Sequence, residues 1–244
     1  MFEILKDSIE SYVRNVGLIL FFSIPFIISL VLLLPPFSPA PVFSALGGYF
    51  LRSGSIPEMT NLDLLVIVLS SGLSLLFISL AAVAVTLVVK SSKTRTRVSA
   101  EAMRNLGKYT FQVFMIFIAF KILEVILLSY LVSIGTNELP VYIFSFLFSL
   151  ALFYIAPAVV LEEKKPVPAM ISSLKHIARR PINFVVWLII AFILLYISAS
   201  LSFLMFVDPM LRQGFIILVN SLFILPFLVV LQAHLYISKY TIIK

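Results

Sequence analysis

Lys121 and Glu124 are the residues whose types and spacing most directly suggest chemistry in this 244-residue sequence. They stand inside the apolar stretch from Thr110 to Ile134, where an isolated charge is costly. A spacing of three places both side chains on one helix face, so we expect an ion pair. Such a pair either marks a solute or proton path or neutralises itself as a structural element. With Asn220 from another apolar stretch, it defines a candidate intramembrane polar site.

Histidine and cysteine, the residues that most often build metal and nucleophilic sites, are scarce. His176 and His234 are the only histidines, and the sequence has no cysteine. Their surroundings lack the spacing of a zinc site, so His176 is expected to be a polar residue of a surface helix. Gln232 and His234 are expected at an interface or in hydrogen bonds between helices. We therefore predict no metal, no cofactor and no catalytic activity.

Adjacent glutamates and a serine pair are the remaining arrangements with catalytic precedent. Glu162 and Glu163 lack the arginine that paired-glutamate intramembrane proteases carry three residues later, because Pro166 occupies that position. Ser70 and Ser71 lack a partner histidine. No glycine-rich phosphate loop occurs, so any ATP-driven activity would need an ATPase on a separate chain.

The composition is that of a membrane protein. Hydrophobic residues make up 61% of the chain and charged residues only 12%, about half the charged share of a soluble domain. The formal net charge is +7, but the basic residues flank apolar segments. This placement favours anionic lipid headgroups over nucleic acid as the partner.

Six apolar stretches are long enough to cross a bilayer as helices. They predict an all-α fold with spans at Val16–Leu34, Leu64–Val89, Thr110–Ile134, Val141–Leu161, Ile182–Phe206 and Gly214–Ile237. Pro25, Pro157 and Pro226 fall inside spans and are expected to kink them or free a carbonyl. The longest outside segment, Pro35 to Asn61, is expected to rest on the membrane as a loop or an interfacial helix.

The basic residues predict the orientation. Fifteen of the 18 lysines and arginines would share one side, which the positive-inside rule assigns to the cytoplasm. Both termini are therefore predicted to be cytoplasmic in a multi-pass protein of the cell membrane. The fifteen are Lys6, Arg14, Lys90, Lys93, Arg95, Arg97, Arg104, Lys108, Lys164, Lys165, Lys175, Arg179, Arg180, Lys239 and Lys244.

A short cytoplasmic amphipathic helix is predicted before each pair of spans. In the third, Val167, Ile171 and Leu174 share an apolar face opposite His176. The single domain, residues 1–244, thus divides into three pseudo-repeats of about 1–90, 91–162 and 163–244. These helices are expected to be interfacial connectors or a docking surface for a partner. Their candidate contacts to lipid headgroups or a partner are Arg104, Lys108, Lys175, Arg179 and Arg180.

Two stretches carry a resemblance to a known group. One is Ala102-Met103-Arg104-Asn105-Leu106-Gly107-Lys108-Tyr109, and the other runs from Ala156-Pro157 through Glu162 and on from Ala169 to Pro181. Both resemble six-span prokaryotic proteins similar to the membrane domain of glycerophosphodiester phosphodiesterases. The resemblance implies a six-helix membrane fold. It brings no catalytic residues, because that chemistry belongs to a separate soluble domain.

These patterns favour a non-catalytic membrane protein that binds lipid or organises a membrane-associated complex with a cytoplasmic or membrane protein partner. The alternative is a transporter or permease subunit with a polar path near Lys121 and Glu124, driven by a separate ATPase. An intramembrane lipid enzyme is disfavoured, because carboxylates, histidine and serine do not gather at one depth.

Overall fold

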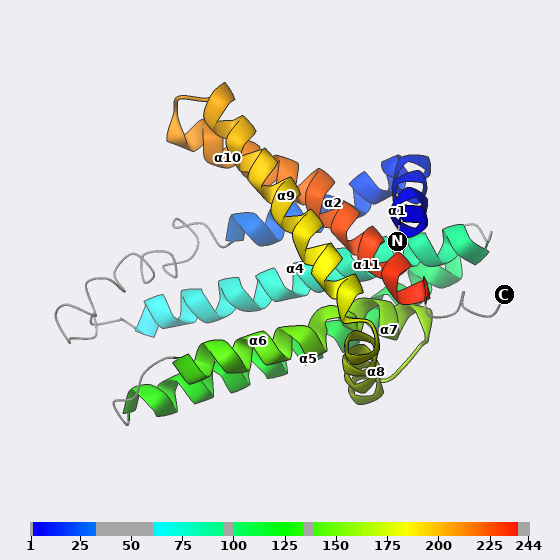
Figure 1. Ribbon diagram of the computed structural model, residues 1–244. Helices are drawn as coiled ribbons and strands as arrows, with labels where there is room; N and C mark the ends of the chain where they lie inside the picture. The colour runs from blue at the N-terminus through cyan, green and yellow to red at the C-terminus, as the bar shows by residue number, and fades with distance from the viewer. Residues whose placement is uncertain (1, 33–60, 95–99, 134–138, 239–244) are drawn as a thin grey trace.

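The computed structural model describes residues 2–32, 61–94, 100–133 and 139–238, and every regular element in these ranges is helical (Figure 1). The elements are α1 (Phe2–Arg14), α2 (Val16–Leu32), α4 (Asn61–Thr94), α5 (Ala100–Ser133), α6 (Leu139–Phe153), α7 (Ile155–Leu161), α8 (Pro166–Arg179), α9 (Pro181–Met205), α10 (Pro209–Val219), the π-helix η1 (Asn220–Ile224) and α11 (Leu225–Ile237). The predicted outer segment, apart from Asn61, lies outside the described residues.

Five described stretches are long and apolar enough to cross a membrane, which confirms the multi-pass, all-helical class. They are Val68–Ser92, Arg104–Leu127, Ile143–Leu161, Pro181–Met205 and Pro209–Ile237. A sixth is added if α1 and α2, which bend by 89° where they meet, are counted together as one broken span. The helix α2 alone has 17 residues, close to the shortest length that spans a bilayer.

Prolines explain two irregularities in the spans. Pro157 has no N–H for the carbonyl of Phe153, four residues earlier, and the fourth span breaks into α6 and α7 at Tyr154. The Gln232 side chain of α11 donates to that freed carbonyl, which confirms the expected role of Gln232 between helices. Pro226 likewise follows η1, and the Tyr12 hydroxyl donates to the freed Leu222 carbonyl at 3.2 Å. Pro25 lies inside α2, which continues through it.

Ser173 of α8 inserts into the same break in the fourth span. Its hydroxyl accepts from the Tyr154 main-chain N–H at 3.0 Å and faces the Leu150 carbonyl at 3.4 Å, the two groups that an unbroken helix would join. Ser173 is fully buried. The break at Tyr154 is therefore stabilised by hydrogen bonds from α8 and α11.

The spans pack most closely at one end of the molecule, which we call the basic end because Lys90, Lys108 and Lys175 lie there. The main apolar core gathers residues of α4, α5, α7, α8 and α11, including Val83, Tyr109, Tyr154, Val159 and Leu235. Figure 1 shows α4, α5 and α6 running side by side, while α9 and α10 diverge from them at the far end. The core thus fixes the basic end and leaves the far end splayed.

The short helices at the basic end differ from the prediction in two ways. Residues 100–109 are the first turns of the continuous helix α5 and not a separate element, so of the three predicted short helices only α1 and α8 are helices of their own. Moreover, α8 turns Ala169, Ser173 and His176 toward the bundle. Of its predicted apolar residues, Met170 and Ile177 pack against the core, whereas Val167, Ile171 and Leu174 are exposed. The threefold pseudo-repeat stays a prediction.

Candidate functional site

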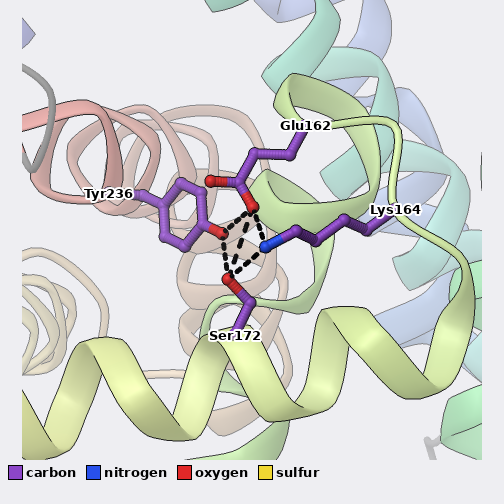
Figure 2. A network of polar contacts seen from close by, with 4 residues as sticks. All are labelled: Glu162, Lys164, Ser172 and Tyr236. Atoms are coloured by element: carbon purple, nitrogen blue, oxygen red, sulfur yellow. Dashed lines mark hydrogen bonds and ion pairs between the residues drawn. The ribbon is translucent and has the colours of Figure 1, made fainter.

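Four side chains form a polar network at the basic end, namely Glu162, Lys164, Ser172 and Tyr236 (Figure 2). The Glu162 carboxylate accepts from Lys164 Nζ at 2.6 Å and from the Tyr236 hydroxyl at 2.8 Å. Ser172 Oγ lies 2.8 Å from the Tyr236 hydroxyl and 2.9 Å from Lys164 Nζ. Tyr236 is fully buried, and the Glu162 side chain is almost so.

Three elements bring the polar network together. Glu162 caps the C-terminus of α7, Ser172 lies in the second turn of α8, and Tyr236 lies near the end of α11. Lys164 belongs to the short turn that joins α7 to α8. The turn is short because Pro166 begins α8, and proline is favoured at the first helical positions.

The polar network contains a serine beside a lysine, an arrangement that can activate a nucleophile. That chemistry requires a neutral lysine to take the serine proton. Here Lys164 Nζ is held in an ion pair with the Glu162 carboxylate, 2.6 Å away. The geometry therefore favours a structural role, in which the polar network links α7, α8 and α11, over a role of Ser172 as a nucleophile.

Glu163, next in the chain, faces the opposite way and pairs with α4. Lys90 Nζ donates to Glu163 Oε1 at 2.8 Å and to the Val160 carbonyl at 3.0 Å. The hydrogen bond and charge of Lys90 lower the pKa of Glu163, with smaller contributions from Tyr109 and Lys108. Glu163 also has φ = 52°, a left-handed conformation that costs a non-glycine residue about 1 kcal/mol.

His176 is a core residue, contrary to the prediction that it is a polar residue of a surface helix. Its ring packs on Tyr154 and Tyr236, with ring centroids 4.6 and 5.3 Å away. The prediction failed because α8 buries the face that carries Ala169, Ser173 and His176, whereas Val167, Ile171 and Leu174 lie on the exposed side. Within the described ranges, no group of three His, Cys, Asp or Glu side chains is placed to hold a metal ion.

The predicted headgroup contacts divide into two groups. Arg104, Lys108, Lys175 and Arg179 are exposed at the basic end. Arg180 is partly buried, and its guanidinium faces the Ser238 carbonyl and hydroxyl at 3.3 Å each. Arg180 therefore ties the start of α9 to the end of α11.

The candidate intramembrane polar site is divided by the structure. Lys121 and Glu124 form the expected pair at 2.7 Å, and Ser145 of α6 donates to Glu124 at 2.5 Å. Asn220 instead lines a pocket between α2, α9 and α10 with Arg212 and Gln213. The pair therefore bridges α5 and α6, with the Lys121 side chain 53% exposed.

Ser172, Ser173 and Tyr236 are the site residues that sequence reasoning missed. Pro157 signals the break that Ser173 enters, because a proline inside a span disrupts the helix one turn earlier. No sequence signal points to Ser172 or Tyr236, whose partner Glu162 is distant in the chain from Tyr236. Comparison of the chain with protein-family models, with curated proteins and with solved structures finds no match in any of the three.

Proposed function

We propose that this chain is a non-catalytic multi-pass protein of the cell membrane that binds anionic phospholipid at its basic end, with both termini cytoplasmic. One observation carries the proposal. The helix α8 packs one face on the bundle and leaves an apolar stripe exposed beside basic residues. The stripe consists of Val167, Ile171 and Leu174, and we call it the α8 stripe.

The α8 stripe has the geometry of an interfacial membrane anchor. Val167, Ile171 and Leu174 are four and three residues apart, so they line one side of the helix. Val167 is 66% exposed and Ile171 48%. The exposed side chains of Lys175 and Arg179 lie next to the stripe, at the height of lipid phosphates when the stripe enters the acyl boundary.

The helix α1 repeats this division of faces. Ser8 and Ser11 are buried toward the bundle, whereas Ile9 and Val13 are exposed. Because α1 carries three acidic and two basic residues, it would add apolar contact with the membrane, and the basic residues of α8 would gather the anionic lipid. A basic surface of this kind also suits a role in organising a membrane-associated complex.

Lipid-dependent stability tests the proposal. The protein in neutral detergent is heated with phosphatidylglycerol or with phosphatidylcholine, and the difference between the two unfolding midpoints is recorded. We expect phosphatidylglycerol to raise the midpoint more, and the double variant Lys175→Gln/Arg179→Gln to lose most of that difference. Glu3→Gln/Glu10→Gln also changes two charges at exposed positions, but it removes acidic groups from α1, so as a control it should not lower the difference. Equal midpoints with both lipids in the unaltered protein would refute lipid selectivity.

The alternative, a transporter or permease subunit driven by a separate ATPase, is favoured by one observation. Lys121 is half exposed on the outside of α5 at a depth where lipid would be its surroundings. A polar path or a second subunit would remove that cost. Replacing both Lys121 and Glu124 by leucine should abolish solute flux in reconstituted vesicles if this alternative holds, and leave lipid selectivity unchanged if it does not.

A further inference from the structure

A groove of about 300 Å³ lies where α5, α6 and the beginning of α8 meet. Its lining includes Met115, Ala119, Phe120 and Leu123 of α5, Phe148 of α6 and Val167 of α8. Ala119 is exposed and small between larger neighbours, and its short side chain leaves the hollow. The α5 residues fall within the candidate span Arg104–Leu127, so the groove lies at the depth of acyl chains.

Every lining side chain of this groove is apolar. Apolar surface at that depth is covered by lipid tails or by another apolar segment, since no water is present to fill it. Phe120 and Phe148 pack with ring centroids 4.4 Å apart and ring planes tilted by 34°, and they close one wall, while Met115 supplies an adaptable side chain. The groove therefore suits a flexible linear chain.

Two exposed lysines stand at the end of the groove nearest the basic end. Lys108 precedes Met115 by seven residues, about two turns, so it lies on the same side of α5 and about 10 Å nearer that end. Lys165 immediately precedes Pro166 and Val167, which both line the groove. Lys108 also acts electrostatically on Glu163, which shows that it lies near the turn that carries Lys165.

We propose that this groove holds one acyl chain of an anionic phospholipid whose phosphate is bound by Lys108 and Lys165. The inference rests on the proposed function and assigns it a specific, tightly held lipid. The two lysines favour a phospholipid over a hydrophobic protein helix as the occupant. An apolar groove that ends in two positive charges matches an acyl chain joined to a phosphate.

Native mass spectrometry of the full chain measures the bound lipid directly. The protein is extracted in mild detergent, stripped of loosely held lipid and titrated with phosphatidylglycerol or phosphatidylcholine. We expect one phosphatidylglycerol to stay bound. Lys108→Gln/Lys165→Gln should weaken it by about fivefold for each lysine removed. Ala119→Trp should displace it by filling the groove, whereas the control Phe192→Trp, on the exposed side of α9, should not.

The outcomes separate this site from the general proposal. If Ala119→Trp and Lys108→Gln/Lys165→Gln both retain the lipid while Lys175→Gln/Arg179→Gln loses phosphatidylglycerol selectivity, the groove site is wrong and the proposed function stands. If no variant changes lipid binding, both fail. Should Ala119→Trp not fold, the lysine variant and a photoreactive acyl chain decide, because crosslinks confined to peptides outside 115–123 and 148–170 would overturn the site.

Discussion

Tyr236 illustrates how single residues hold the basic end together. Its buried hydroxyl donates to Glu162 and contacts Ser172, so one ring links α11 to α7 and α8. Tyr236→Phe removes a hydrogen bond to a carboxylate and should lower the free energy of unfolding by about 1–2 kcal/mol. Denaturant unfolding in detergent measures the change. Tyr196→Phe, at an exposed position of α9, is the matched control and should change stability by less than about 0.5 kcal/mol.

Glu163 predicts how stability depends on pH. Lys90 lowers its pKa below the ordinary 4.5, so folding favours the carboxylate. The pair should therefore stabilise the protein above about pH 4.5 and lose this effect as the pH falls through the lowered pKa of the folded state. Because the Glu163 side chain is 64% exposed, its contribution is at most about 1 kcal/mol.

Unfolding of the unaltered protein and of Glu163→Gln, compared between about pH 7 and pH 3, tests this expectation. The two free energies should differ at neutral pH and converge in acid. A gap that stays constant across the range would mean that the Glu163 charge contributes nothing.

The break between α6 and α7 is the clearest case in which a whole element depends on a distant side chain. Gln232→Leu leaves the Phe153 carbonyl without its donor and should cost about 1–3 kcal/mol. Pro157→Ala restores a main-chain N–H that can bond the same carbonyl, so Gln232→Leu should cost about 1 kcal/mol less in that background. Equal costs in both backgrounds would show that the Gln232 hydrogen bond does not replace the main-chain bond that Pro157 removes.

Sequence reasoning located the helices well and oriented the short ones badly. The fifth predicted span, Ile182–Phe206, nearly coincides with α9, because a long apolar run in a bilayer has one stable form. The buried face of α8 was mistaken because lipid, like a protein core, accepts Val167 and Ile171. Burial in the bundle then favours small residues such as Ala169 and Ser173, which allow close approach. The polar network joins residues up to 74 positions apart, which no local pattern reveals.

At the scale of the whole molecule, the basic end and the splayed end should lie on opposite sides of the membrane. The sequence contains no cysteine, so single cysteines report position without background. Met210→Cys, at an exposed position near the α9–α10 turn, should react with an impermeant maleimide in intact cells. Glu10→Cys and Lys175→Cys should react only after permeabilisation. The reverse pattern would invert the orientation and place the basic surface against the outer leaflet.

The two proline breaks also impose an order on biosynthesis. The Phe153 carbonyl accepts a hydrogen bond from Gln232, which is synthesised 79 residues later. The Leu222 carbonyl accepts one from Tyr12, which is synthesised 210 residues earlier. The fourth segment therefore leaves the ribosome with an unsatisfied group that only the last segment completes, and the N-terminal helix finds its acceptor at that same moment. In a nascent chain halted before residue 220, the Phe153 carbonyl lacks its donor and the Tyr12 hydroxyl lacks its acceptor. Insertion of the segment that contains Leu222 and Gln232 supplies both partners.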